Sequence, residues 1–156
     1  MFFKLALTFL LAAVATLQVN AEQHTVSFTN KCGHGTPTLK GQNGQTLSTG
    51  GAWTSSGEAL GLIAYLPLVG GCGTNGEGCT LVEATLKNGG SAADISLISP
   101  HEFSVTSGFG FYGGCDGAGT DCTSSSCPKA YRQPDDNFAI VGCSASNVNL
   151  AITFCD

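Results

Sequence analysis

The sequence has little charge and no long helical pattern. Only 11% of its 156 residues are charged, and its six Lys and Arg side chains form no cluster. Nucleic-acid binding requires a basic stripe that neutralises phosphates, so we expect no nucleic-acid partner, and anionic membranes are disfavoured on the same grounds. No stretch of ten residues places apolar side chains at helical spacing, which leaves strands and turns as the expected elements.

Long apolar runs are also scarce, and the one present lies at the N-terminus. Lys4 precedes a run of about 13 residues over 5–17, which suits the apolar part of a signal peptide and is too short to span a bilayer. Val19 and Ala21 occupy positions −3 and −1 of a cleavage site after Ala21. We therefore predict a signal peptide over residues 1–21, with an N-terminal core helix or a membrane anchor as alternatives. No other apolar segment is long enough for a membrane span.

The segment after the predicted signal is long enough for one domain with a core of its own. Loss of Lys4 with the signal changes the formal net charge from −5 to −6. Neither a linker nor an internal repeat divides this segment. We predict a single domain over residues 22–156, and we expect it to be a monomer.

All eight cysteines lie in this domain. An even number in an exported chain indicates four disulfides, with 105 possible pairings that spacing alone leaves open. A zinc site is the alternative, because His34 lies two residues after Cys32. No Cys-x-x-Cys and no second Cys/His pair at ligand spacing accompanies them, so we expect no metal and no cofactor. The eight are Cys32, Cys72, Cys79, Cys115, Cys122, Cys127, Cys143 and Cys155.

Short segments with apolar residues at every second position indicate half-buried antiparallel strands. Turn signals separate them, such as Asn75-Gly76 and Asn88-Gly89-Gly90. A denser apolar run over 60–69, broken by Pro67, predicts a central strand that ends near the proline. These features predict a β-sandwich-like domain. The alternating segments are 24–30 (HTVSFTN), 80–86 (TLVEATL), 93–98 (ADISLI) and 148–154 (VNLAITF).

Six segments, in order along the chain, resemble landmarks of the thaumatin-like proteins. They are residues 28–32 (FTNKC), 47–53 (LSTGGAW), 79–86 (CTLVEATL), 94–105 (DISLISPHEFSV), 127–131 (CPKAY) and 151–155 (AITFC). The resemblance covers nearly the whole predicted domain and implies an all-β, thaumatin-like antiparallel β-sandwich stapled by disulfides. Only residues 105–126 stand where long members of the family have a loop-rich second domain. The chain is therefore similar to the short thaumatin-like proteins.

The resemblance also implies a disulfide pairing and an acidic site. Matched by landmark, the disulfides are Cys32–Cys155, Cys72–Cys79, Cys115–Cys143 and Cys122–Cys127. Long members have an acidic cleft built from an arginine, a glutamate and three aspartates. Glu83 matches the glutamate and Asp94 the first aspartate. The second aspartate position falls on Ser99, the third lies in the missing region, and the nearby Lys87 does not match the arginine.

The strand pattern turns Glu83 and Asp94 away from the core, so they are compatible with a shared surface. Glycoside hydrolysis uses two carboxylates, which makes the pair a candidate for catalysis or for sugar binding. Solvated acids on a sheet face are the alternative. Phe109, Phe111 and Tyr112 lie in the glycine-rich segment 109–114 and are candidates for stacking on sugar rings, with burial in the core as the alternative.

These observations predict a secreted protein of the extracellular space or cell wall. The leading function is binding of β-1,3-glucan-like wall polysaccharide in defence or wall remodelling, as the resemblance implies. One alternative is a secreted effector or stress protein that binds an extracellular protein in a host–microbe contact. Another is a weak endo-β-1,3-glucanase. Other enzyme classes are disfavoured, because the sequence has no Gly-x-Ser-x-Gly elbow and no second His follows His101-Glu102 at helical spacing.

Overall fold

The computed structural model describes residues 21–68 and 70–156, so the predicted signal peptide, apart from Ala21, lies outside it. The described part contains eleven strands and one short 3-10 turn. No helix within it is long and apolar enough to cross a membrane. The elements are β1 (Gln23–Asn30), β2 (Thr38–Lys40), β3 (Thr46–Thr49), β4 (Trp53–Ser56), β5 (Ala59–Tyr65), β6 (Leu81–Leu86), β7 (Ser91–Ser96), β8 (Ser107–Tyr112), β9 (Gly119–Cys122), η1 (Asn137–Ala139), β10 (Val141–Cys143) and β11 (Asn149–Phe154).

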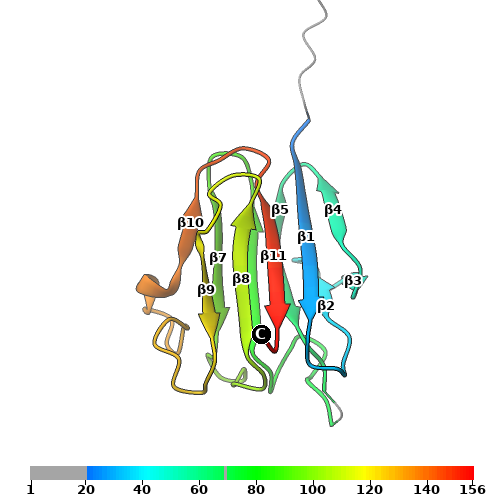
Figure 1. The fold of residues 1–156 in the computed structure, drawn as a ribbon, viewed down its shortest axis with the longest axis vertical. Coiled ribbons are helices and arrows are strands. Elements are labelled where there is room, and N and C mark those ends of the chain that lie inside the picture. The colour runs from blue at the N-terminus through cyan, green and yellow to red at the C-terminus, as the bar shows by residue number, and fades with distance from the viewer. Residues whose placement is uncertain (1–20, 69) are drawn as a thin grey trace, which may run out of the picture.

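The strands form two sheets that pack face to face (Figure 1). One sheet has the order β4-β1-β11-β8-β9, and the other has the order β10-β7-β6-β5-β2-β3. The predicted all-β sandwich is therefore confirmed. One strand pair departs from the antiparallel pattern, because β1 and β11 run parallel with Val26 opposite Leu150. The first and last strands thus lie side by side within their sheet.

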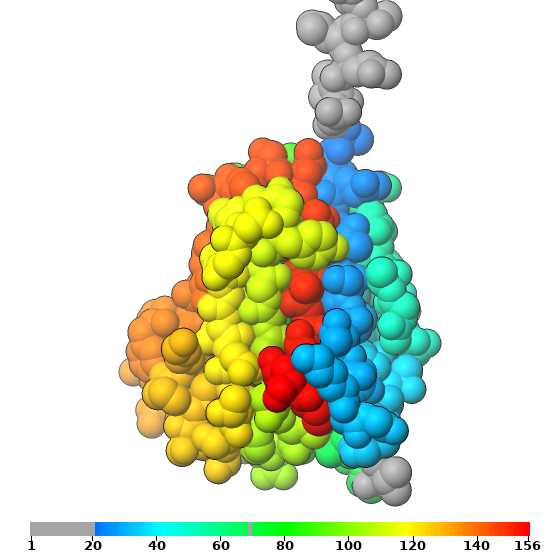
Figure 2. Space-filling view, in the orientation of Figure 1, coloured from blue at the N-terminus to red at the C-terminus, as the bar shows by residue number. Residues whose placement is uncertain are grey.

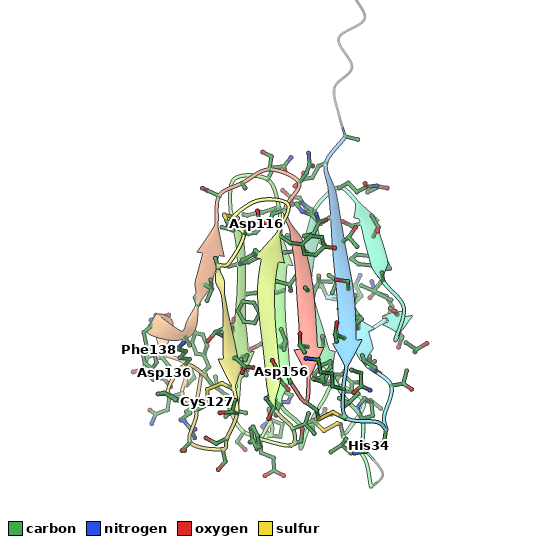
Figure 3. The ribbon with its side chains drawn as sticks, viewed as in Figure 1. His34, Asp116, Cys127, Asp136, Phe138 and Asp156 are labelled. Atoms are coloured by element: carbon green, nitrogen blue, oxygen red, sulfur yellow. A yellow bond between two sulfur atoms is a disulfide. The ribbon has the colours of Figure 1, made fainter. Side chains whose placement is uncertain are left out.

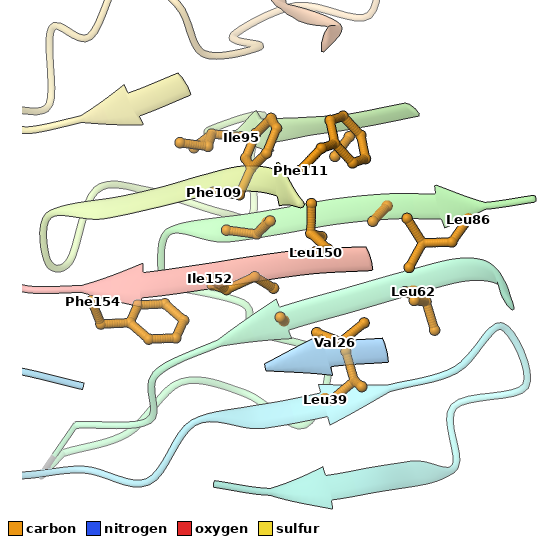
Figure 4. Close-up of a cluster of buried hydrophobic side chains, with 14 of the residues drawn as sticks. Val26, Leu39, Leu62, Leu86, Ile95, Phe109, Phe111, Leu150, Ile152 and Phe154 are labelled. Atoms are coloured by element: carbon orange, nitrogen blue, oxygen red, sulfur yellow. The ribbon is translucent and has the colours of Figure 1, made fainter. Parts of the chain in front are cut away.

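The core fills the space between the sheets and comes from the apolar residues at every second position (Figure 4). In β11, Leu150, Ile152 and Phe154 are at most 1% exposed, which confirms the alternation predicted for this segment. β6 contributes Val82 and Leu86 from the facing sheet. Interdigitated apolar side chains of this kind supply most of the favourable free energy of folding.

β8 corrects the interpretation of the glycine-rich segment, which is largely strand and not an exposed loop. Gly108 and Gly110 alternate with Phe109 and Phe111, so both rings point into the core, where they are 6% and 3% exposed. Their centroids lie 6.2 Å apart in an edge-to-face arrangement. The predicted stacking of Phe109 and Phe111 on a ligand is wrong, and the alternative of core packing is correct. Tyr112 is half-buried on the other face, and its sugar-binding role stays a prediction.

Four disulfides join the strands, and they are the pairs that the resemblance implies. Cys32–Cys155 links the segments that follow β1 and β11, with a sequence separation of 123 residues. Cys115–Cys143 joins the loop after β8 to β10, across the two sheets. The other two close short loops, at Cys72–Cys79 and Cys122–Cys127. No described cysteine is free, and the described residues hold no group of three His, Cys, Asp or Glu side chains placed for a metal ion.

Candidate functional site

Glu83 and Asp94 lie directly opposite each other on neighbouring antiparallel strands. Glu83 belongs to β6 and Asp94 to β7, and their Cα atoms are register partners. On each strand the flanking residues, such as Val82 and Ala93, are buried in the core, so both acids point to the outer face of the six-stranded sheet. Side chains of directly opposed residues are close enough to interact. The structure thus brings together the two acids that the resemblance singled out.

A shallow hollow of about 270 Å³ surrounds the pair. Gly61 and Ile63 of β5 form one side of it, while Thr85 and Ala92 extend it toward the end of the sheet. The hollow therefore combines two carboxyl groups with a small apolar surface and one hydroxyl.

Asp94 has a perturbed carboxyl group. Burial, and then the charge of Glu83, raises the pKa of Asp94 from 3.8 to about 7. Its Oδ1 atom is buried and has no hydrogen-bond partner among the described residues. A carboxyl group that keeps its proton near neutral pH offers a donor as well as an acceptor. A partly buried, unpartnered group of this kind is a candidate for ligand contact.

No cation within residues 21–68 and 70–156 neutralises the two acids. The ion pair in this part of the protein joins His24 of β1 to Glu22, and β1 belongs to the other sheet. Lys87 lies in the turn after β6, where its backbone contacts Ser91, and Ser99 lies in the loop after β7. The arginine that the resemblance implied for an acidic cleft thus has no counterpart beside Glu83 and Asp94, which is consistent with the raised pKa of Asp94.

Two residues beside the site were not predicted. Lys40 of β2 is aligned with Ile63 on the same sheet face, but its ammonium group donates to the carbonyl of Thr74 in the loop over that face. Tyr131 lies beside β7, and its backbone N–H donates a hydrogen bond to the carbonyl of Ile95. Burial, and then the charge of Asp94, raises the pKa of Tyr131. Tyr131 ends the landmark segment 127–131, but nothing in that motif indicates that it approaches Asp94.

The loop over residues 70–79 covers another part of the same sheet. The Cys72–Cys79 disulfide closes this loop, which packs on Tyr65 and Leu81 in a second, smaller apolar cluster. The Tyr65 hydroxyl donates to the carbonyl of Thr74 at 2.8 Å and fixes the loop to the sheet. No residue of this loop lines the hollow around the two acids.

Fold and site together define a disulfide-stapled β-sandwich with a small acidic hollow on one sheet. No protein-family model matches the chain. Thaumatin-like pathogenesis-related protein 4 from Avena sativa is 28% identical over an alignment of 170 positions, which spans 95% of this chain and 96% of the oat protein. The solved structure of the thaumatin-like xylanase inhibitor TLXI matches with a TM-score of 0.57 at 18% identity, over 85% of this chain and 99% of that one. The resemblance to small thaumatin-like proteins is confirmed, and so is the thaumatin-like fold.

Proposed function

We propose that this protein is exported after cleavage behind Ala21 and binds wall polysaccharide of the β-1,3-glucan type, in defence or wall remodelling. Four disulfides are typical of chains that work outside the cell. The name of the oat relative, a pathogenesis-related protein, supports a role in defence. The domain that carries the function is residues 22–156.

The direct pairing of Glu83 with Asp94 is the observation that carries this proposal. A sugar hydroxyl both donates and accepts hydrogen bonds. A carboxylate and a neighbouring protonated carboxyl group together supply the matching acceptor and donor. Hydrogen bonds to charged groups contribute more than bonds between neutral groups. Ile63 and Ala92 add apolar surface that the C–H groups of a sugar ring would contact. The hollow therefore suits a neutral, hydroxyl-rich ligand.

The test is co-sedimentation of residues 22–156 with insoluble β-1,3-glucan, with chitin and cellulose in parallel. We expect binding to the glucan, and we expect Glu83→Gln with Asp94→Asn to weaken it by about 1 to 3 kcal/mol, or roughly 5- to 150-fold. Glu102→Gln, at another exposed acid, is the matched control and should bind as the wild type does. Equal binding of the double variant would contradict the proposal. Release of reducing sugar by the wild type, lost in either single variant, would instead support the glucanase alternative.

A second function is supported by the exposed Phe138. This ring is 71% exposed on η1, which bulges from the side of the sandwich (Figures 1 and 2). Asp136 fixes the loop before it by accepting hydrogen bonds from the backbone of Arg132 at 2.9 Å and of Gln133 at 3.0 Å. Figure 3 shows Asp136 and Phe138 together at this edge. A fixed loop that presents an aromatic side chain suits insertion into the cleft of a protein partner.

A polysaccharide-degrading enzyme is the partner we propose for this loop, supported by the name of the xylanase inhibitor that shares the fold. The test measures how much the purified protein slows a xylanase and a β-1,3-glucanase. Phe138→Ala should remove most of the inhibition, because aromatic anchors carry much of the binding energy in such interfaces. His34→Ala, at an exposed ring on a loop away from Phe138 (Figure 3), is the control. Inhibition that survives Phe138→Ala would exclude this loop, and no inhibition by the wild type would exclude the function.

A further inference from the structure

The two sheets leave a groove at one open edge of the sandwich. β4 is the edge strand of one sheet and β3 the edge strand of the other, and both lie on the same side of the molecule (Figure 1). The groove between them has a volume of about 460 Å³, which is within the range of small-molecule sites. It differs from the acidic hollow, which lies on the outer face of the six-stranded sheet, although Leu62 lines both.

Trp53, the single tryptophan of the chain, lines this groove. It pairs with the buried Val26, so its indole points between the sheets, yet β4 is an edge strand and no further strand covers the ring. The side chain packs on the core and remains partly exposed. Leu60, which is 40% exposed, extends the apolar surface at the rim. An indole with one accessible side is suited to contact the C–H face of a sugar ring.

Polar side chains with unused hydrogen-bonding capacity form the rest of the rim. Gln42, Asn43 and Gln45 come from the turn between β2 and β3, and Glu58 comes from the turn before β5. All four are exposed, and none of their side chains makes a hydrogen bond to another residue within 21–68 or 70–156. The turn itself is ordered, because Gly44 N donates to the Gly41 carbonyl at 2.9 Å.

Two glycines let glutamine side chains of this rim lie close to the backbone. A Cβ at Gly41 would lie 2.6 Å from Nε2 of Gln45, so the Gln45 amide packs directly on the backbone there. A Cβ at Gly61 would lie 3.1 Å from the Gln42 side chain. The Gln45 amide and the Cβ and Cγ of Gln42 therefore lie against glycine backbone at the mouth of the groove, and both side chains remain exposed.

We propose that this groove binds a neutral oligosaccharide, with Trp53 as the stacking surface and Gln42, Gln45 and Glu58 as hydrogen-bonding partners. Glu58 is the one charged residue of the lining, so anionic ligands such as phosphates or uronic-acid polymers are repelled. Amides and a carboxylate together supply the donors and acceptors that hydroxyl groups require. The ligand class follows from this lining and does not depend on the acidic hollow.

Because Trp53 is the only tryptophan, its fluorescence reports on this groove alone. The experiment titrates residues 22–156 with laminaripentaose, cellopentaose, xylopentaose and, as an anionic control, penta-galacturonic acid. We expect a saturable shift of the emission to shorter wavelength with at least one neutral pentasaccharide and none with the anionic one. Gln45→Ala should weaken the fitted affinity roughly 3- to 10-fold, and Gln133→Ala, an exposed glutamine on a remote loop, should not change it.

The double variant Glu83→Gln, Asp94→Asn separates this site from the acidic hollow. We expect it to keep the fluorescence titration of the wild type while its co-sedimentation with glucan falls. The inference is overturned if no neutral pentasaccharide shifts the emission at millimolar concentration, or if Gln45→Ala binds as tightly as the wild type. A shift that disappears in the double acid variant would place the ligand in the hollow and would also overturn it. Co-sedimentation without any fluorescence change would overturn it too and would leave only the function proposed for the hollow.

Discussion

Replacing Asp94 by Asn should change how the stability of the protein depends on pH. In the folded protein, burial and the charge of Glu83 raise the pKa of Asp94 from 3.8 to about 7. The folded state therefore holds more protons than the unfolded state between these two values, and linkage makes stability fall as pH rises through this window. The asparagine amide of the variant does not titrate, so Asp94→Asn lacks this contribution.

The size of the effect follows from the two pKa values. A rise from 3.8 to about 7 corresponds to about 4 kcal/mol, since each pKa unit is worth about 1.4 kcal/mol. The carboxyl group is partly exposed, and solvent screening reduces this value, so we expect about 2 kcal/mol. For a domain of this size, that difference moves the midpoint of thermal unfolding by roughly 6 to 10 °C.

The measurement is thermal or guanidinium unfolding of the wild type and Asp94→Asn at several pH values from 4 to 8. At pH 4 the two proteins should be similar in stability, and at pH 8 the variant should be the more stable by about 2 kcal/mol. Glu83→Gln should also gain part of this stability at pH 8, because the charge of Glu83 contributes to the raised pKa of Asp94. A constant gap between wild type and Asp94→Asn across the range would show that the Asp94 carboxyl group does not titrate as the structure indicates.

Three further predictions concern the staples, the N-terminus and the core. Replacing Cys32 and Cys155 by Ser should lower the free energy of unfolding by about 5 kcal/mol, against about 2 kcal/mol for Cys72 and Cys79, because the two disulfides close loops of 123 and 7 residues. Equal losses of stability in chemical unfolding would contradict this. Mass spectrometry of the exported protein should find Glu22 as its first residue, and a first residue beyond Glu22 would contradict the proposed cleavage. Phe109→Ala should lower stability by about 3 to 5 kcal/mol, measured by guanidinium unfolding, because the ring is buried in the core. If the folded variant lost glucan binding, Phe109 would have to contact the ligand, and its assignment to the core would be wrong.

Most strands of the sandwich can be predicted from the sequence because apolar and polar residues alternate in them without interruption. In β11 every second residue is a large apolar one, and the segment ends in the Cys155 that anchors it. β8 is harder to predict because its outward positions are Gly108 and Gly110, which resemble loop residues. A side chain at Gly108 would contact the Asp121 carboxylate of the neighbouring strand, with Oδ1 only 2.5 Å from a Cβ. The strict alternation of glycine with phenylalanine was the available signal.

The pairing of the two acids is also implicit in the sequence. Asn88-Gly89 lies at the middle of the turn between β6 and β7, and Gly90 N donates to the Lys87 carbonyl at 3.2 Å. A hairpin centred there fixes the register of both strands, and it places Glu83 opposite Asp94. The burial of Asp94 cannot be predicted in this way, since it depends on Tyr131 and on the strands packed beside β7.

Trp53 shows why the sequence does not predict the edge groove. Trp53 ends the landmark segment 47–53, and its indole packs on the core, but the edge position of β4 leaves part of the ring open. That exposure depends on which strands border each sheet, and a local pattern carries no such information. Gly61 then connects the two candidate sites, because it lines the acidic hollow while the Gln42 side chain of the groove rim lies against it. A polysaccharide that continues past the groove would reach Glu83 and Asp94, so a long glucan should depend on both sites and a short oligosaccharide on one of them.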